Sequence, residues 1–408
     1  MNCRFCTTEL THELIDLVGS PASNSFLSKV QLNEPEIYFP LKVLVCDKCL
    51  LVQIDEYKKS DSIFDSEYVY FSSFSSSWLS HAREYVEMIT KRLSLTADSY
   101  VIEIASNDGY LLQNFVATHI PALGIEPTKN TAAAAVLKGI ETITEFFGSS
   151  LASSLKEKGV GADLFLGNNV LAHVPDIVDL VKGMKIILKP GGTITMEFPH
   201  LLQLMENTQF DTIYHEHFSY LSFYSVKQIF ESQGLELYDV EEIPTHGGSL
   251  RIYGKHLEND KLRIEPSVNK LLAKEMKAGI ADLKYYEVFK ERVQKIKFDF
   301  TRFLIEQKSR GKKLAGYGAA AKGNTLLNYC GLKNDLIDFV VDANPAKQNK
   351  FLPGSHIPVV AESKLKMEKP DYVIIFPWNL REEILEQLKY VKDWGGKFVV
   401  PIPELEVI

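Results

Sequence analysis

Residues 101–110 read Val101-Ile102-Glu103-Ile104-Ala105-Ser106-Asn107-Asp108-Gly109-Tyr110. The mostly apolar first half, followed by small and polar residues, indicates a buried strand, a tight turn and the start of a helix. From Ser99 to about Tyr253 the chain repeats this alternation of short strands and helical segments. Such alternation is typical of a doubly wound α/β domain. We expect its strands at Tyr100–Ile104, Ala122–Ile125, Leu164–Gly167 and Gly192–Phe198.

The composition changes along the chain and predicts four segments. They are a cysteine-bearing module (1–60), the α/β domain (61–256, with a helical lead-in over 61–98), a helical connector (257–310) and a second α/β unit that is Rossmann-like (311–408). The connector is rich in Lys and Glu at helical spacing, which predicts a solvated helix. Further strands are expected at Leu41–Val45, Phe339–Val341 and Tyr372–Phe376.

The overall composition is that of an ordinary globular protein. The 408 residues are 45% hydrophobic and 24% charged, with a formal net charge of −8. A dedicated nucleic-acid binder needs a surplus of Lys and Arg, so this acidic balance argues against one. No apolar run is long enough to span a bilayer, and the N-terminus lacks the order of a signal peptide. We expect a cytoplasmic protein that contacts neither nucleic acid nor membrane.

Four of the five cysteines form two identical pairs, Cys3-x-x-Cys6 and Cys46-x-x-Cys49. Cytoplasmic thiols stay reduced, which argues against disulfides, although a redox pair is an alternative. Two such pairs supply four thiolates to a tetrahedral zinc ion. A zinc ion with four protein ligands has no open position, so we expect a structural role. The fifth, Cys330, fits a small core residue.

A candidate nucleotide site follows the first strand. Glu103 ends this strand just before the small-residue turn, and Glu126 closes the next strand in Gly124-Ile125-Glu126-Pro127. An acidic residue about 20 positions after such a turn can accept both ribose hydroxyls of a nucleotide. The turn alone would fit NAD as readily as another adenosine cofactor. An α/β domain without a cofactor is the remaining alternative.

Four motifs in order resemble those of class I S-adenosylmethionine-dependent methyltransferases: the turn at 103–109, Gly124–Pro127, Asp163–Asp176 and the turn at Leu188–Gly192. The family usually has glycine where this chain has Ala105. The resemblance implies a class I, Rossmann-like methyltransferase domain, with Gly109 against the methionine part of the cofactor and Glu126 on its ribose. The implied cofactor-binding residues are Glu103, Ala105, Ser106, Asn107, Asp108, Gly109, Glu126, Pro127, Asn168 and Asn169.

The most unusual segment is Asp211-Thr212-Ile213-Tyr214-His215-Glu216-His217-Phe218-Ser219-Tyr220. A catalytic zinc site is one interpretation of its two histidines and glutamate. The spacing of the known His-Glu-x-x-His zinc motif is absent, however, and adjacent residues of a strand alternate faces. A polar surface loop is a second interpretation. The neighbouring aromatic residues Phe218, Phe223 and Tyr224 favour burial in a cleft.

The whole chain, from Cys3 onward, resembles the nucleotide-sugar C-methyltransferase family, whose members add a methyl branch to dTDP-linked keto-deoxysugars. The resemblance implies that the nucleotide-sugar lies between the methyltransferase domain and the Rossmann-like C-terminal domain. Five motifs carry it, in this order: the cysteine pairs, the turn at 103–109, Tyr214–Tyr220, His246–Arg251 and Gly316–Asn324.

The implied chemistry requires a base. A carbon beside a ketone becomes nucleophilic when a base removes its proton and the enolate oxygen is stabilised. A neutral imidazole is available because histidine titrates near pH ~6.5. We expect His215 to be structural, since it would face away from His217 in an extended segment. The implied roles are His217 as base, Glu216 orienting or polarising it, Tyr214 beside the sugar, Tyr68 on the ketone or enolate, and His173 as a second candidate base.

The C-terminal unit carries the glycine turn Gly316–Asn324, in which Lys322 adds a positive charge to a helix start. Taken alone, this turn fits NAD and a diphosphate equally well. The family resemblance favours the substrate diphosphate. Asp342 binds a ribose hydroxyl or caps a turn, and Arg251 reaches the phosphate or sugar or is a surface arginine. The expected substrate-binding residues are Tyr70, Arg251, Gly318, Ala319, Lys322, Asn324 and Asp342.

The leading hypothesis is a monomeric S-adenosylmethionine-dependent C-methyltransferase with one structural zinc ion. Its expected substrate is a dTDP- or GDP-linked keto-sugar. An O- or N-methyltransferase acting on a nucleotide-sugar is the nearest alternative. An NAD-dependent nucleotide-sugar oxidoreductase and a zinc-finger protein that binds nucleic acid are more distant ones.

Overall fold

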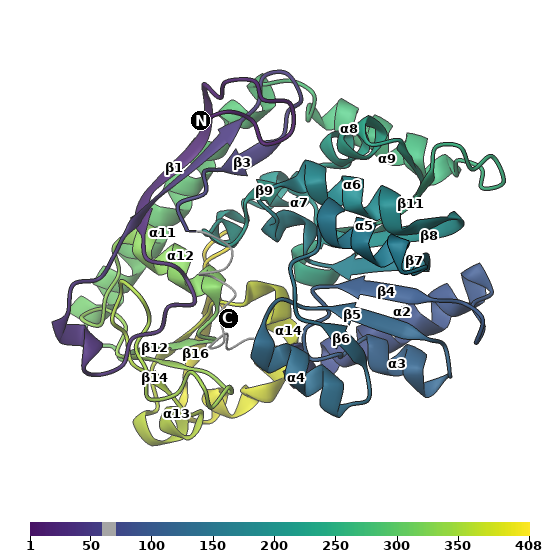
Figure 1. Cartoon of the computed structure of the whole chain (residues 1–408). Coiled ribbons are helices and arrows are strands. Elements are labelled where there is room, and N and C mark those ends of the chain that lie inside the picture. Colours follow the sequence, from purple (N-terminus) through teal and green to yellow (C-terminus); the bar gives the residue numbers. More distant parts are fainter. Residues whose placement is uncertain (59–70) are drawn as a thin grey trace.

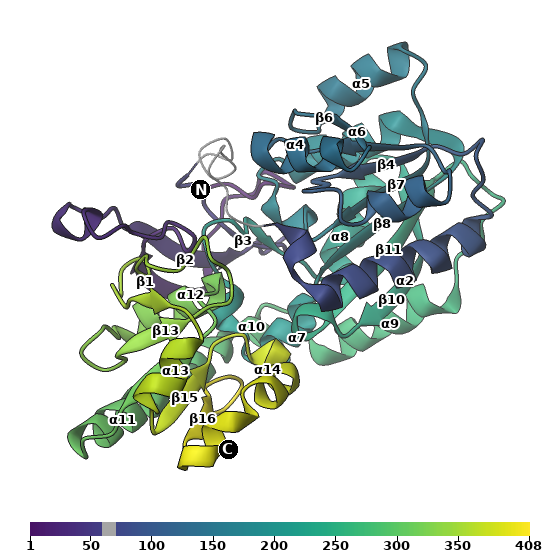
Figure 2. The ribbon, with the colours of Figure 1, turned by 90° about the horizontal axis from the view of Figure 1, so that it is seen from below.

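The computed structural model describes residues 1–58 and 71–408, and these residues form three β-sheets (Figure 1). The four-stranded N-terminal sheet and the six-stranded C-terminal sheet lie on one side of the molecule, and the seven-stranded sheet lies on the other (Figures 1 and 2). Within the described ranges, no helix combines the length and the apolar character that a membrane crossing requires.

The seven-stranded sheet has the order β10-β11-β8-β7-β4-β5-β6 and contains all four strands expected from the sequence. Strands β4 to β8 are parallel, and β10 and β11 form an antiparallel hairpin beside β8. The strands are β4 (Val101–Ile104), β5 (Ala122–Ile125), β6 (Glu141–Ile143), β7 (Ala162–Asn168), β8 (Leu188–Pro199), β10 (Leu235–Ile243) and β11 (Ser249–His256).

Helices cover both faces of this sheet, which explains why β4 is buried along its whole length. One face packs on α2 and α3, and the other packs on α5, α6, α8 and α9. Because β5 and β7 flank β4 on opposite sides, the carboxyl ends of β4 and β7 form a topological switch point, where such sheets bind ligands. The helices are α2 (Ser76–Leu93), α3 (Leu112–Ala117), α4 (Lys129–Leu137), α5 (Ser149–Glu157), α6 (Ile177–Ile187), α7 (Leu201–Glu206), α8 (Phe223–Ser232) and α9 (Pro266–Ala278).

The N-terminal sheet is antiparallel and has the order β1-β2-β3-β9. Its fourth strand comes from the segment that follows the seven-stranded sheet's β8, since Val52 pairs with Tyr220. The segment that carries the predicted base therefore runs directly into the N-terminal sheet. The strands are β1 (His12–Ser20), β2 (Phe39–Val45), β3 (Val52–Ile54) and β9 (Ser219–Tyr220).

The C-terminal sheet has the order β14-β13-β12-β15-β16-β17, in which only β17 is antiparallel to its neighbour. Its switch point lies between β12 and β15. The elements are β12 (Leu314–Tyr317), α12 (Ala321–Cys330), β13 (Phe339–Val341), β14 (Val359–Val360), α13 (Ser363–Glu368), β15 (Tyr372–Ile375), α14 (Arg381–Gln387), β16 (Lys397–Val400) and β17 (Glu406–Val407).

The segment expected to be a solvated connector is solvated on one face only. After the short α10 (Lys284–Glu287), α11 (Phe289–Ser309) buries Phe289, Val293 and Phe300 along one stripe. This stripe belongs to a single core cluster with β1 to β3, α7 and the C-terminal sheet. The charge-rich composition concealed the stripe because apolar residues at a three- to four-residue spacing suffice to anchor a helix.

Candidate active site

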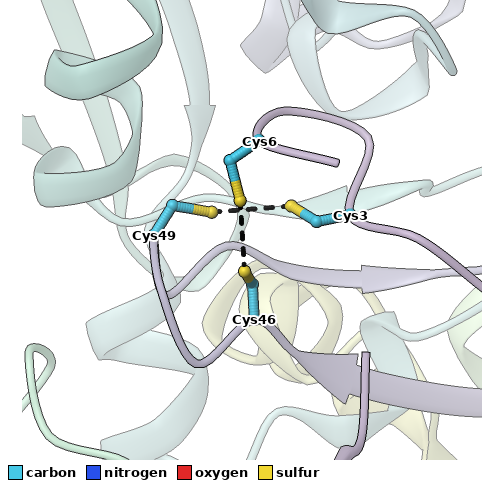
Figure 3. Close-up of side chains that lie close together, drawn as sticks. All are labelled: Cys3, Cys6, Cys46 and Cys49. Carbon is cyan, nitrogen blue, oxygen red and sulfur yellow. Dashed lines mark hydrogen bonds between the residues drawn. The ribbon is translucent and has the colours of Figure 1, made fainter. Parts of the chain in front are cut away.

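The four paired cysteines converge at one end of the N-terminal sheet (Figure 3). All four sulfur atoms lie within 4.8 Å of one another, with Cys3 Sγ 3.5 Å from Cys49 Sγ and Cys6 Sγ 3.4 Å from Cys46 Sγ. A tetrahedral zinc ion with bonds of about 2.3 Å requires sulfur separations of this size. Gln53 donates from Nε2 to Cys3 Sγ at 3.2 Å, a contact that favours the thiolate. The donor set fits a structural zinc ion.

The turn after β4 is stabilised by Glu126 from the end of β5. Its Oε2 accepts from the Asn107 backbone N–H at 2.9 Å, and its Oε1 accepts from the Thr128 N–H at 2.8 Å. Ala105 and Asn107 adopt φ values of 50° and 51°, which small or amide side chains tolerate. Gly109 has a φ of 74°, and a Cβ there would meet Ile140 Cδ1 at 2.2 Å. The packing of α4 thus gives one reason for this glycine, and its contact with the methionine part stays a prediction.

Several buried polar atoms around this turn have no hydrogen-bond partner among the described residues. They are both carboxylate oxygens of Glu103, Ser106 Oγ, Asp108 Oδ1, Asn168 Nδ2 and Asn169 Oδ1. Burial, followed by the charges of Glu126 and Asp108, raises the pKa of Glu103 well above its usual value. A cluster of carboxylates and unused hydrogen-bonding atoms fits a ligand that has hydroxyl groups and a positive charge, such as S-adenosylmethionine. Pro127 follows Glu126 at the same edge of the sheet.

Asn169, which directly follows β7, connects the end of that strand to the β10–β11 hairpin. It adopts a φ of 56°, its backbone N–H donates to Glu197 O at 2.7 Å, and its Nδ2 donates to His246 Nε2 at 3.0 Å. His246 therefore carries its proton on Nδ1 when it is neutral. Its ring lies 5.3 Å from that of Trp78, and burial lowers its pKa to about 4. An uncharged imidazole thus lies at the carboxyl ends of the central strands.

The side chain of Arg251 forms ion pairs within its own α/β domain. Its Nε donates to Glu197 Oε1 at 2.7 Å, its Nη1 contacts Glu241 Oε2 at 2.9 Å, and its guanidinium lies over the Tyr85 ring. Glu197 Oε2 also contacts His81 Nε2 at 2.8 Å. These ion pairs neutralise Arg251, which is only 7% exposed. Its expected contact with the phosphate or sugar therefore has no support in the geometry, and a solvated surface position is excluded.

His217 and His173 form a close pair. Their ring centroids lie 4.6 Å apart at 75°, and the Tyr214 ring lies 4.1 Å from that of His217. His217 Nδ1 is 2.8 Å from the carbonyl oxygen of Thr212. Because a carbonyl only accepts, Nδ1 carries the proton and Nε2 keeps its lone pair. Nε2 of His217 is therefore available as a base.

The surroundings keep both rings neutral near pH 7. Burial lowers the pKa of His173 to about 4. Burial lowers the pKa of His217 well below its usual value, and the charges of His173, Lys322 and His246 lower it further. Lys322 belongs to the C-terminal domain. A charge of one Rossmann-like unit therefore acts on a histidine of the other.

Glu216 and His215 contact the N-terminal module. Glu216 Oε1 accepts from Asn24 Nδ2 at 2.7 Å, and His215 Nε2 lies 3.1 Å from Pro40 O. No hydrogen bond joins Glu216 to His217 among the described residues, because Thr212 bonds the ring instead. A role of Glu216 in orienting or polarising His217 stays a prediction. The other two residues with expected roles on this side, Tyr68 and Tyr70, lie outside the described residues.

Lys322 lies against the base-bearing segment. Its Nζ is 2.9 Å from Asn379 Oδ1 and 4.4 Å from the centre of the Trp378 ring. Trp378 Nε1 in turn donates to Asp211 Oδ2 at 2.8 Å. Burial lowers the pKa of Lys322 to about 8, and the charge of Asp211 opposes this shift. One turn further along α12, Thr325 Oγ1 donates to Ile213 O at 2.9 Å.

The other expected substrate residues of the C-terminal unit already form contacts within the protein. Asp342 Oδ2 accepts from the Ala319 N–H at 2.8 Å, and Oδ1 accepts from the Asn344 N–H at 2.8 Å. Asn324 is fully buried and donates from Nδ2 to Ser23 O at 2.6 Å, so it anchors the N-terminal module. Gly318 has a φ of 88° and packs against the Pro377 ring.

Four residues of this site received no role from the sequence. Trp378 and Asn379 follow β15, the strand next to β12, and a strand-end position in a Rossmann-like unit was the available signal. His246 was used only as part of a motif, without a role. Asp211 was named only as the start of the unusual segment.

This strand order, with carboxylates and unused polar atoms at the switch point, defines a class I S-adenosylmethionine-dependent methyltransferase. Family models match almost the whole chain in three parts: a zinc binding domain at residues 3–64, a methyltransferase domain at 78–240 and a C-methyltransferase C-terminal domain at 244–403. The C-methyltransferase NovU of Streptomyces niveus is 34% identical over 406 residues, which is 100% of this chain and 96% of that protein. The chain belongs to the C-methyltransferase family.

Two solved methyltransferase structures are similar to a part of the chain. An S-adenosylmethionine-dependent methyltransferase from Clostridium acetobutylicum is 12% identical and covers 44% of this chain and 92% of its own, with a TM-score of 0.36. A magnesium protoporphyrin IX methyltransferase from Synechocystis is 12% identical and covers 43% of this chain and 81% of its own, with a TM-score of 0.34.

Proposed function

We propose that this C-methyltransferase acts on a nucleoside-diphosphate keto-sugar, at a carbon adjacent to the ketone. The observation that carries the proposal is the position of His217: a half-buried, neutral imidazole whose Nε2 lone pair can accept a proton lies within electrostatic reach of the half-buried Lys322. The imidazole of His217 can accept a proton from an acidic C–H, and the ammonium of Lys322 can bind an anionic group of the same substrate. They come from the two Rossmann-like units, between which an elongated substrate would lie.

In the proposed reaction, His217 Nε2 takes the proton from the carbon beside the ketone, and the electron pair left behind forms the enolate. The proton stays on His217 as an imidazolium, whose Nδ1–H remains bonded to Thr212 O. Bound S-adenosylmethionine supplies an electrophilic methyl group on a sulfonium ion. His173 and Tyr214 hold the ring of His217 in place by packing against it. General-base catalysis of this kind commonly contributes about 10²–10⁴ in rate.

The low basicity of His217 in the ligand-free protein fits this mechanism. A useful general base titrates near the working pH. The positive charge of Lys322 is one cause that lowers the pKa of His217. A diphosphate bound at Lys322 would offset that charge and raise the pKa of His217 toward the working range. Substrate binding would thereby activate the base.

We assign the diphosphate to Lys322 and the start of α12. The half-buried ammonium group of Lys322 contacts the Asn379 amide oxygen and the Trp378 ring but forms no ion pair with a described residue, so it is ready to bind an anion. Asp211 is the carboxylate whose charge acts on it. The first N–H groups of α12 point from a helix start that no side chain caps, which favours negative charge.

The test is incubation with methyl-labelled S-adenosylmethionine and a panel of dTDP- and GDP-linked keto-sugars, followed by NMR of the product. The proposal requires the labelled methyl on a carbon next to the carbonyl. A labelled methyl ether or methylamine would instead show the nearest alternative, an O- or N-methyltransferase. Tight, saturable binding of NAD with oxidation of a sugar would reject the assignment of the C-terminal turn.

A further inference from the structure

A half-buried arginine in the zinc-binding knuckle contacts the segments that carry the paired histidines. Arg4 lies between the ligands Cys3 and Cys6, in the loop drawn in Figure 3. Its Nη1 donates to Pro175 O at 2.7 Å, and its Nη2 donates to Ile54 O at 2.5 Å. No described residue forms an ion pair with Arg4, so its guanidinium group serves main-chain carbonyls. A surface zinc module has no need of such a group.

The contacts of Arg4 lie next to both histidines. Pro175 is two residues after His173, and the guanidinium carbon lies 5.4 Å from the centre of the Phe218 ring, which directly follows His217. Arg4 therefore contacts both segments that present the imidazole pair. Its backbone N–H is also fixed, because it donates to Gln53 Oε1 at 2.9 Å.

The backbone closes the same connection. The Phe218 N–H donates to Ala172 O at 2.8 Å, and the Ile54 N–H donates to Phe218 O at 3.1 Å. Ala172, which precedes His173, and Ile54, at the end of β3, are thus both hydrogen-bonded to Phe218. Arg4 contacts this same group of segments. A planar guanidinium can donate to two carbonyls and stack on a ring at once, which an ammonium group cannot do.

We infer that Arg4 is a positioning residue, which transmits the geometry of the zinc knuckle to the His173–His217 pair. The zinc ion fixes the loop that carries Arg4, Arg4 fixes Pro175 and Phe218, and these fix the spacing of the two rings. The zinc site then serves catalysis without touching the substrate. This inference rests on the proposed role of His217 only for the effect on turnover.

The test compares Arg4→Met and Arg4→Lys with the wild type, and uses Lys48→Met as the matched control. Lys48 is exposed and occupies a spacer position of the other knuckle. We expect Arg4→Met to retain one zinc ion and normal S-adenosylmethionine binding. Its kcat should fall by about tenfold or more, since a displacement of about 1 Å can cost 10²-fold. Arg4→Lys should restore little of the lost kcat, and Lys48→Met should have the kcat and zinc content of the wild type.

A readout independent of turnover is the NMR titration of His217 in histidine-labelled protein. Loosening the pair should raise the pKa of His217 toward its usual value, because the effects of burial and of His173, Lys322 and His246 weaken with separation. An unchanged titration of His217 with full zinc content would overturn the inference. If the wild type neither exchanges the α-proton nor methylates a keto-sugar, the proposed function fails, and the titration still decides the role of Arg4.

If Arg4→Met loses zinc, Phe218→Leu is the deciding variant. It removes the ring that packs against Arg4 and leaves the sequence of the knuckle unchanged. With zinc retained, it should raise the pKa of His217 in the same direction as Arg4→Met. A Phe218→Leu protein with full zinc and an unchanged titration of His217 would also reject the inference.

Discussion

His217 Nδ1 lies 2.8 Å from the carbonyl oxygen of Thr212, five residues earlier in the same segment. This one contact fixes the tautomer of the imidazole and leaves Nε2 as its basic atom. The segment is itself held from the C-terminal domain, because Thr325 donates to Ile213 O and Trp378 donates to Asp211. The orientation of the base therefore depends on docking of the two Rossmann-like units.

Replacing His217 by Asn should abolish basicity at this position while preserving some polarity and shape. We expect kcat to fall by roughly 10²–10⁴-fold, the usual contribution of a general base, with S-adenosylmethionine binding unchanged. The measurement is turnover together with exchange of the α-proton of a keto-sugar in deuterated water. His119→Asn, an exposed histidine of the same domain, is the control. A His217→Asn enzyme that keeps both activities would point to His173 or Tyr68 as the base.

Lys322 should set the alkaline limit of activity. Its pKa is lowered to about 8, so it loses its positive charge as the pH rises through 8, and kcat/KM for an anionic substrate should fall there. Lys322→Met should remove this limb and raise KM by at least about tenfold, since a charged hydrogen bond is worth about 1.5–3 kcal/mol. The acid limb should move to higher pH, because one cause that lowers the pKa of His217 is gone.

The control for this experiment is Lys392→Met, an exposed lysine of the same domain. Its pH profile should match that of the wild type. An alkaline limb that persists unchanged in Lys322→Met would show that another group titrates there.

Glu126 should bind the cofactor ribose. Each of its carboxylate oxygens accepts one backbone N–H in the ligand-free protein, which leaves further lone pairs for the two hydroxyls. Glu126→Gln keeps the shape but loses the charge and one acceptor. We expect the Kd for S-adenosylmethionine to rise by about tenfold or more in calorimetry. Equal affinity in Glu126→Gln and in the exposed control Glu141→Gln would mean that the cofactor lies elsewhere.

Local sequence patterns were sufficient for the elements that are buried on both faces. The expected strands β5 and β13 agree with the structure to the residue, and the ends of β4 and β7 differ by one or two residues. Apolar runs bounded by glycine and acidic turns carry this information within a few residues. The cysteine spacing likewise predicted a cluster that the structure brings together.

Contacts between distant segments were beyond these patterns. Arg251 pairs with Glu197, 54 positions away, and Asn324 anchors Ser23, 301 positions away. Both partners are buried, yet in residue type they do not differ from the glutamates and serines of the surface. The same holds for β9, whose two residues become a strand only because β3 offers them a free edge. The motifs also did not show that Glu216 and Asn324 contact the N-terminal module, since a motif does not state which neighbour its polar atoms meet.

Loss of zinc should loosen more than the N-terminal module. A structural metal ion contributes its binding free energy to folding, and β2 and β3 lead directly into and out of the second cysteine pair. Because β3 also pairs with β9, Cys46→Ser or chelation should lower hydrogen-exchange protection in residues 12–54 and in Ser219–Tyr220. Cys330→Ala, which removes the one cysteine outside the cluster, should keep its zinc and this protection. Fresh wild-type protein with well under one zinc ion per chain, or a chelated protein with unchanged protection, would contradict the prediction.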